Sequence, residues 1–316
     1  MTGPELALTR TGTPDAGERA VVVAFLDRTQ AAGRPALGGP ARAALEQGGG
    51  PGFEAVLARS GTGELVGYAQ VGRTGDRFAV EVVVGGDDRT RALPRGEALL
   101  GAALEAVAAQ GGGPVTLWAP EADATTDALA GWAGLGAERD LHQMRCRLPL
   151  ERSAPPLPVR AFRPGRDEEA WLAANNRAFA GHPEQGAWEL GTLLAREAEP
   201  WFDAGGFLLH ERHGRLAGSC WTKIHDQADP PLGEIYVISV DPDFQGLGLG
   251  RALTVAGLDH LAGRGIGVGM LYVDAANRAA VALYLDLGFT RHHVDRAYTG
   301  LVSGGRWSPP APRPRT

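Results

Sequence analysis

The chain carries the same short motifs in both of its halves, and this repetition constrains the possible fold more than any other feature. The copies keep their order and a separation of 151 or 152 residues, which chance similarity between glycine-rich pieces does not explain. The matched segments are 63–67 with 214–218, 95–98 with 247–250, and 135–137 with 287–289. We therefore expect two copies of one domain.

A proline-rich segment divides the chain almost in half. Residues 149–160 contain four prolines, and proline disrupts both helix interiors and central strands. The segment is therefore predicted to be an extended linker. On this division, residues 1–148 form the first domain, 161–302 form the second, and 303–316, rich in Pro and Arg, form a disordered tail.

Both halves show the same order of predicted elements. A helix is followed by a hairpin, a long strand, a second helix, a strand, a third helix ended by glycine, and a last strand. Up to the third helix the ranges are 16–32, 53–72, 78–84, 95–110, 115–119 and 125–134, then 167–180, 206–225, 233–240, 248–263, 268–274 and 277–287. This order predicts a mixed α/β fold of two tandem domains, each with a central mixed sheet flanked by helices.

Composition excludes several classes of function. The net charge is −6 with both signs mixed along the chain, so neither a nucleic-acid partner nor a membrane partner is expected. No apolar run is long enough for a membrane span or resembles a secretory signal. The only two cysteines, Cys146 and Cys220, lie far apart in sequence, which favours a reducing cytoplasm. The Ala, Gly, Arg and Pro content indicates a GC-rich bacterial genome.

A glycine-rich turn in the second half joins a strand to a helix. Gln245–Gly250, with the sequence Gln-Gly-Leu-Gly-Leu-Gly, directly follows the predicted strand at 233–240 and the turn after it. Glycine allows the backbone to approach a ligand closely, and the amides of a first helical turn have no partner inside the helix. The segment is therefore suited to binding the phosphates of a cofactor.

Three phosphate-binding patterns compete for this turn. A P-loop requires a lysine that is absent here. A dinucleotide turn, Gly-x-Gly-x-x-Gly, places Arg251 or Leu253 at its third glycine. The pattern Gln/Arg-x-x-Gly-x-Gly/Ala fits Gln245, Gly248 and Gly250. This last pattern resembles the pyrophosphate-binding turn of the GCN5-related N-acetyltransferases (GNATs).

The resemblance extends beyond the turn. Asn277–Ala280, Tyr284 and Leu287–Phe289 follow it in GNAT order. The tandem layout, with 182–186 and 233–237, resembles actinobacterial members that acetylate the cysteine amine of cysteinyl-glucosaminyl-inositol. The resemblance thus implies an acetyl-CoA-dependent N-acetyltransferase that acts on a small-molecule amine and needs no metal.

By this resemblance acetyl-CoA contacts three segments of the second half. The first holds the acetyl-pantetheine arm as an added strand would, the second holds the pyrophosphate, and the third lines the other side of the cofactor. Their residues are Ile238, Ser239 and Val240; Gln245, Gly246, Leu247, Gly248, Leu249, Gly250 and Arg251; and Asn277, Arg278, Ala279, Ala280, Val281 and Ala282. The implied substrate contacts are Glu184, Lys223, Glu234 and Tyr272.

The reaction needs two groups that handle protons. An amine attacks a thioester only when it is unprotonated, and Glu234 at the start of the central strand is the candidate base. Tyr284 is the candidate acid for the leaving thiolate, because a neutral phenol can donate a proton. Transfer is expected to be direct, since Cys220 has no evident neighbouring base.

The first half departs from the pattern. At an offset of 152, Gln245 falls on Leu93 and the glycine pair becomes Gly96 and Ala98; Tyr284 falls on Trp132, Asn277 on Thr125, and Glu234 near Glu81. We therefore expect no chemistry in this domain. It is predicted to hold a second, weaker acetyl-CoA site that includes Val82, Val83, Val84, Arg95, Gly96 and Ala98, or to form a wall of the substrate cleft.

Other readings stay open. The same chemistry could serve another amine, such as an aminoglycoside, a polyamine or a protein N-terminus, because fold does not fix the acceptor. A non-catalytic acyl-CoA sensor would leave Glu234 and Tyr284 unexplained. Neighbouring strand residues such as His292 and His293 face opposite ways, 210–213 lacks zinc-protease spacing, and 241–243 is a turn, so no metal site is predicted. A monomer is expected, because tandem units can cover each other's sheet edges.

Overall fold

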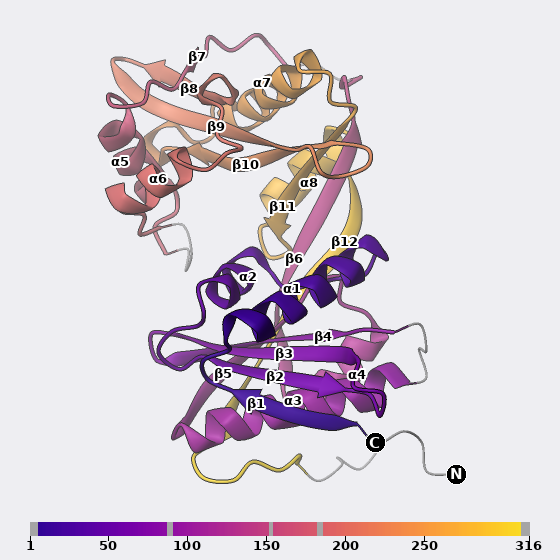
Figure 1. Ribbon diagram of the computed structural model, residues 1–316. Helices are drawn as coiled ribbons and strands as arrows, with labels where there is room; N and C mark the ends of the chain where they lie inside the picture. The colour runs from indigo at the N-terminus through magenta and orange to yellow at the C-terminus, as the bar shows by residue number, and fades with distance from the viewer. Residues whose placement is uncertain (1–5, 87–90, 152–153, 182–185, 311–316) are drawn as a thin grey trace, which may run out of the picture. The chain divides into compact units, whose positions relative to one another are not determined.

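Two compact units make up the chain in the computed structural model, which describes residues 6–86, 91–151, 154–181 and 186–310 (Figure 1). Unit 1 comprises residues 1–141 and 293–316, and unit 2 comprises residues 142–292. The predicted domain ranges differ from these units at two places. Residues 142–148 belong to unit 2 and residues 293–302 to unit 1, because β6 and β12 each contribute residues to both units.

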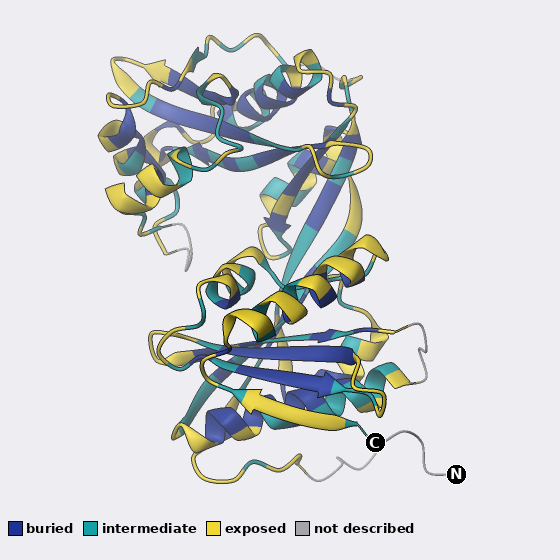
Figure 2. Cartoon of the chain, viewed as in Figure 1, coloured by how far each residue is buried: buried dark blue, intermediate teal, exposed yellow. Residues whose placement is uncertain are grey.

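Unit 1 is a layered α/β structure. Its strands follow the order β1-β2-β3-β4-β5-β12-β6, with β12 antiparallel to β5. The bounds are β1 Ala7–Thr11, α1 Ala16–Ala31, α2 Gly39–Glu46, β2 Glu54–Arg59, β3 Leu65–Thr74, β4 Arg77–Val84, α3 Ala92–Ala109, β5 Gly112–Ala119, α4 Ala124–Trp132 and β6 Gly136–Arg147. Side chains of α1 and α2 pack on one face of the sheet, and those of α3 and α4 pack on the other. The edge strand β1 is largely exposed, whereas β2 and β3 are buried (Figure 2).

Unit 2 repeats this plan with the strand order β12-β6-β11-β10-β9-β8-β7. The bounds are β7 Arg160–Ala161, α5 Glu168–Ala178, α6 Leu190–Glu197, η2 Ala204–Gly206, β8 Phe207–Arg212, β9 Arg215–His225, β10 Leu232–Val240, η3 Pro242–Phe244, α7 Leu249–Gly263, β11 Val268–Asp274, α8 Arg278–Asp286 and β12 Thr290–Ser303. An aromatic core under α5 and α6 includes Trp171, Phe207 and Trp221. The opposite face packs against α7 and α8.

The helices and strands predicted in both halves are present, and β11 has the predicted bounds. Four further elements, β1, α2, α6 and β7, were not predicted from the sequence. These elements are short, and β1 is too exposed to show the alternation of a half-buried strand. Arg160 at the end of the linker and Ala161 directly after it pair with β8, so the end of the linker joins the sheet.

The alignment of the two halves at an offset of 152 is wrong at the second and third helices of each half. At the second helix, Leu99 and Leu253 contact the matched glycines Gly67 and Gly218, which gives an offset of 154 and makes Arg91 rather than Leu93 the counterpart of Gln245.

The glycines that end the third helix give the same offset. Gly134 and Gly288 both have positive φ and both end the third helix. The next residues, Leu135 and Phe289, donate amide hydrogen bonds back to Ala130 and Tyr284, respectively. The glycine turn therefore fixes an offset of 154 here, and the counterpart of Tyr284 is Ala130 rather than Trp132. By the same offset Asn277 corresponds to Asp123 rather than Thr125, and each of these residues caps its helix.

The expected disordered tail is ordered over its described part, residues 303–310. The Trp307 ring packs edge-on against Trp132 with 5.4 Å between ring centroids, and the Gly305 amide donates to the Ala108 carbonyl. An indole supplies enough apolar surface to fix a proline-rich segment that has no regular structure of its own.

Replacing Trp307 by Ala is expected to lower the free energy of unfolding of unit 1 by about 2 kcal/mol, because it removes apolar contact area and an aromatic pair. Urea unfolding followed by tryptophan fluorescence measures the change. The matched control is Leu301→Ala, since Leu301 is 77% exposed and its loss is expected to cost less than about 0.5 kcal/mol. Equal unfolding midpoints for the two variants would show that the tail does not stabilise the unit.

Candidate functional site

The central strands of unit 2 separate at their carboxyl ends. The parallel ladder between β10 and β11 ends at the pair Ile235–Leu271, while the antiparallel ladder between β10 and β9 continues to Val240–Gly218. The register of β10 also shifts between Ile235 and Val237. Backbone groups of 238–240 on the side of β11 therefore have no partner in β11 and can pair with another extended group. The GNAT resemblance implies the acetyl-pantetheine arm at these residues.

The glycine-rich turn has the backbone that phosphate binding requires. Gly246 and Gly248 have φ of 78° and 75°, a region that side chains other than glycine rarely occupy. Helix α7 begins directly afterwards, and no side chain caps its first turn. The earliest helical bond comes from the Ala252 amide to the Gly248 carbonyl, at 3.2 Å. The preceding amides are therefore available to an anion.

An ion-pair cluster fixes the start of this turn. The Asp241 side chain is 4% exposed, caps η3 through the Asp243 amide, and lies 3.0 Å from the Arg177 guanidinium. Arg215 pairs with Asp243 at 2.8 Å. Residues 241–243 thus form the predicted turn, and the buried Asp241 carboxylate holds it in place because Arg177 and the Asp243 amide are its partners.

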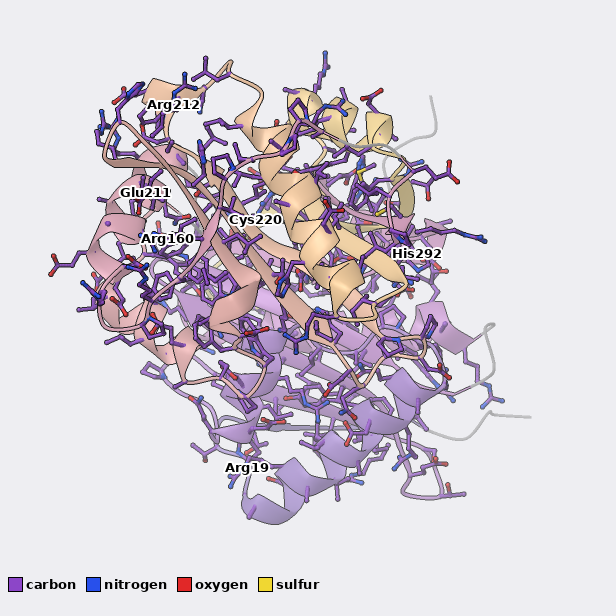
Figure 3. The ribbon with its side chains drawn as sticks, turned by 90° about the horizontal axis from the view of Figure 1, so that it is seen from above. Arg19, Arg160, Glu211, Arg212, Cys220 and His292 are labelled. Carbon is purple, nitrogen blue, oxygen red and sulfur yellow. The ribbon has the colours of Figure 1, made fainter. Side chains whose placement is uncertain are left out.

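Helix α7 lies unusually close to the sheet, which sets the position of its first turn. A Cβ added at Gly257 would overlap the sulfur of Cys220 on β9, and Gly218 and Gly233 are equally tight against leucines of the helix. Figure 3 labels Cys220 beside this helix. Burial raises the pKa of the Cys220 thiol to about 12, so the thiol stays protonated at neutral pH. This agrees with transfer that does not pass through a cysteine.

The third predicted cofactor segment is the first turn of α8. Asn277 caps the helix by accepting a hydrogen bond from the Ala280 amide at 3.2 Å, and residues 277–279 are exposed. Arg251 on α7 pairs with Asp286 at the end of α8. This ion pair holds the two helices together beside the turn.

Two predicted residues, Glu234 and Lys223, lie together on the sheet face covered by α5 and α6. Glu234 lies opposite Lys223 in the β9–β10 ladder, and the Glu234 side chain is only 10% exposed. Its Oε2 accepts a 2.7 Å hydrogen bond from Nε2 of His225, a residue that sequence reasoning missed. The Lys223 ammonium instead lies over the Trp201 ring, 4.5 Å from its centroid. Glu234 therefore has imidazole, not ammonium, as its hydrogen-bond partner.

Tyr284 lies on the opposite face of the sheet, in the core under α7 and α8. It is 5% exposed and packs against Phe289, with ring centroids 5.7 Å apart. Burial, and then the nearby Cys220, raise the pKa of the phenol, so it remains protonated at neutral pH. The structure therefore places Glu234 and Tyr284 on different faces of the sheet.

Of the remaining predicted contacts, Tyr272 lies on β11 and is 39% exposed. Its hydroxyl accepts a 2.8 Å hydrogen bond from Gln143 on β6, a contact that the sequence did not indicate. Glu184 lies outside the described residues. No group of three or more His, Cys, Asp or Glu residues suited to a metal is found in the described ranges. No helix in the same ranges could cross a membrane.

Comparison with known proteins identifies the family. The acetyltransferase (GNAT) family profile matches residues 166–289. A mycothiol acetyltransferase from Thermobispora bispora is 50% identical over 81% of this chain and 86% of its own length. A mycothiol acetyltransferase from Geodermatophilus obscurus is 45% identical over 89% of this chain and 93% of its own length. The chain belongs to the mycothiol acetyltransferase family.

Solved structures support the fold. A GCN5-related N-acetyltransferase from Sphaerobacter thermophilus matches with a TM-score of 0.67 and 22% identity, covering 96% of this chain and 98% of the other. A tandem GNAT protein from the clavulanic acid biosynthesis pathway matches with a TM-score of 0.66 and 17% identity, covering 95% and 100%. The predicted GNAT resemblance, the tandem mixed α/β fold and the acetyltransferase class are thus confirmed.

Unit 1 has the same early end of its parallel strand pair as unit 2, but different side-chain contacts around it. The ladder between β4 and β5 ends at Glu81–Trp118, so residues 82–84 extend beyond it as 238–240 do in unit 2. Glu81, however, accepts a 2.7 Å hydrogen bond from the Gly38 amide at the start of α2. Burial raises the pKa of this carboxyl group. The carboxylate that matches Glu234 thus holds a helix start in unit 1.

Helix α3, which follows β4, begins earlier than its counterpart α7 and therefore leaves less chain for a turn like the glycine turn of unit 2. Leu99 and Leu253 are equivalent residues of the two helices. Leu99 contacts Gly67 on β3, and Leu253 contacts Gly218, the matching glycine on β9. Helix α3 begins seven residues before Leu99, whereas α7 begins four residues before Leu253. The backbone that forms the glycine turn in unit 2 is therefore partly helical in unit 1. Arg95, predicted at the second cofactor site, donates to the Gly85 carbonyl at 3.0 Å, and Gly96 packs on Leu129.

Proposed function

We propose that this protein transfers the acetyl group of acetyl-CoA to the cysteine amine of cysteinyl-glucosaminyl-inositol, the last step of mycothiol biosynthesis. The observation that carries the proposal is the 44–50% identity to relatives named mycothiol acetyltransferase, over most of both chains. The arrangement in unit 2 supplies residues for each requirement of the reaction. Unit 1 is proposed to do no chemistry.

The residues of unit 2 fit acetyl-CoA in three respects. The opening between β10 and β11 leaves backbone groups of Ile238, Ser239 and Val240 for an amide-containing arm. The uncapped turn from Gln245 to Arg251 offers amides to a diphosphate. When bound, the thioester would supply the activated acyl group, and the residues of the chain orient it and exclude water.

Glu234 is proposed to take the proton from the substrate amine. Its Oε2 is occupied by His225, whereas its Oε1 makes no hydrogen bond with any residue that the structure describes. A carboxylate with one oxygen held and one free can accept a proton directly or through a water molecule. Lys223 and Tyr272, on the neighbouring strands, are proposed to contact the substrate. Glu184 remains a sequence-based proposal.

Tyr284 is proposed to protonate the leaving sulfur. The raised pKa keeps the phenol neutral across the working pH range, so the proton to be donated is always present. Within the described part of the chain its hydroxyl has no hydrogen-bond partner, although its ring is packed. The hydroxyl is thus free to interact with a substrate atom.

For the first half we retain the weaker proposal that Val82, Val83, Val84, Arg95, Gly96 and Ala98 border a second acetyl-CoA site. The early start of α3 and the engaged Arg95 both act against tight binding there. The cytoplasmic location is supported by two free, buried cysteines. The monomeric state stays a prediction.

A panel of amines tests the substrate assignment. Loss of acetyl-CoA is followed by chromatography, since the preferred substrate carries its own thiol and would disturb thiol reagents. We expect turnover with cysteinyl-glucosaminyl-inositol, and much slower reaction with an aminoglycoside, spermidine or a peptide N-terminus. Preference for one of the other amines would reject this acceptor and keep the acetyltransferase, whereas binding of acetyl-CoA without turnover of any amine would favour the sensor.

Replacing Gly248 by Ala is expected to weaken acetyl-CoA binding about tenfold, because a left-handed conformation costs a residue with a Cβ roughly 1–2 kcal/mol. Titration calorimetry with acetyl-CoA measures the effect. The control is Gly263→Ala in the same helix, where φ is ordinary and a Cβ meets open space. Equal affinities of the two variants would contradict the role of the turn.

Replacing Tyr284 by Phe should lower turnover about a hundredfold while leaving acetyl-CoA affinity unchanged, since only the proton donor is removed. Steady-state kinetics and calorimetry separate the two effects. Tyr298→Phe removes a hydroxyl that donates to Asp127 in unit 1 and should leave turnover unaltered. Unchanged kcat in the Tyr284 variant would reject the assignment of the acid.

A further inference from the structure

The two units share a carboxylate on the central strand but differ in the residue beside it. Glu234 lies opposite Lys223, and two residues further along β9 stands His225. Glu81 lies opposite Gln70, and two residues further along β3 stands Gly72. Residues two apart on a strand share a face, so each position is a diagonal neighbour of its carboxylate. An imidazole therefore accompanies the carboxylate only in the unit proposed to be catalytic.

The contact between the two side chains is short and partly open to water. His225 Nε2 lies 2.7 Å from Glu234 Oε2, with the His225 side chain 31% exposed and that of Glu234 10% exposed. A carboxylate can only accept, so Nε2 carries the hydrogen. His225 is the last residue of β9, where the chain turns toward β10, and its ring reaches both the buried carboxylate and solvent.

Neighbouring charged groups do not compete for this contact. Lys223 lies over Trp201 and Tyr236 and makes no ion pair with Glu234 within the described residues. On the same face, Arg196 and Glu199 from the end of α6 and the segment after it act on Tyr236, whose pKa is raised mainly by burial. Tyr272 on β11 is bonded to Gln143. The imidazole is thus the only described side chain bonded to the Glu234 carboxylate.

We propose that His225 is the positioning residue for the Glu234 base. The inference rests on the proposed function and deepens it. The Nε2–H donor fixes one carboxylate oxygen, so that Oε1 is presented to the ammonium of the acceptor. In unit 1 the Gly38 amide, not an imidazole, donates to the carboxylate, so Glu81 is oriented toward the start of α2.

The test compares His225→Ala with His225→Gln, whose amide can donate to Glu234 but cannot titrate. His225→Ala should lower kcat/KM for the amine about tenfold, as expected for loss of a hydrogen bond to a charged group. His225→Gln should recover most of the rate, and acetyl-CoA affinity should be unchanged in both.

Two further variants keep the test specific. Adding His225→Ala to Glu234→Gln should cause no additional loss, since the imidazole acts through the carboxylate. His213→Asn, in an exposed turn of unit 2, is the matched histidine control and should behave as wild type. Thermal unfolding of each variant separates loss of rate from loss of structure.

The proposal is overturned if His225→Ala keeps the wild-type kcat/KM for the amine, if His225→Gln rescues nothing, or if His225→Ala slows the Glu234→Gln enzyme by the same factor as the wild-type enzyme. The assay uses whichever amine the panel identifies. A wrong acceptor therefore shows itself as a different preferred amine in the wild-type enzyme, while a wrong role for His225 shows itself in the variants alone.

Discussion

The separation of β10 from β11 is the constraint on which the rest of unit 2 depends. A parallel pair that ends at Ile235–Leu271 leaves main-chain groups without a strand partner, and a shift in register at the same point turns the following residues. Unpaired backbone groups inside a sheet are costly unless a ligand bonds to them. The glycine turn, the start of α8 and Glu234 all lie along the two strands that border this opening.

The two units share this opening but differ in what surrounds it. Unit 1 has the same early end of its parallel ladder, at Glu81–Trp118. There, α3 begins three residues earlier relative to its leucine anchor, Ala130 stands where Tyr284 would be, and Glu81 is bonded to a backbone amide. The duplicated backbone thus supports two outcomes, which are decided by where a helix begins and by which side chains surround one carboxylate.

Most helices and strands could be predicted from local sequence patterns. The strand at 268–274 and the helices around it are bounded by glycine turns and marked by apolar periodicity, both of which act over a few residues. The assumption of a constant offset between the halves was wrong because spacing alone paired Gly136 with Gly288. The glycine that ends helix α4, as Gly288 ends α8, is Gly134. The tail prediction failed because Trp307 finds its partner about 175 residues away, at Trp132.

By itself, the sequence determined the tandem α/β plan, the glycine-rich turn between strand and helix, and the family, because these depend on short-range motifs and on their order. Only the tertiary structure decided that β6 and β12 contribute to both units, that Tyr284 corresponds to Ala130, and that Glu234 is bonded to His225 rather than to Lys223. Those features arise from strand register and side-chain direction. A shift of one residue changes the face on which a side chain lies, and no local motif records it.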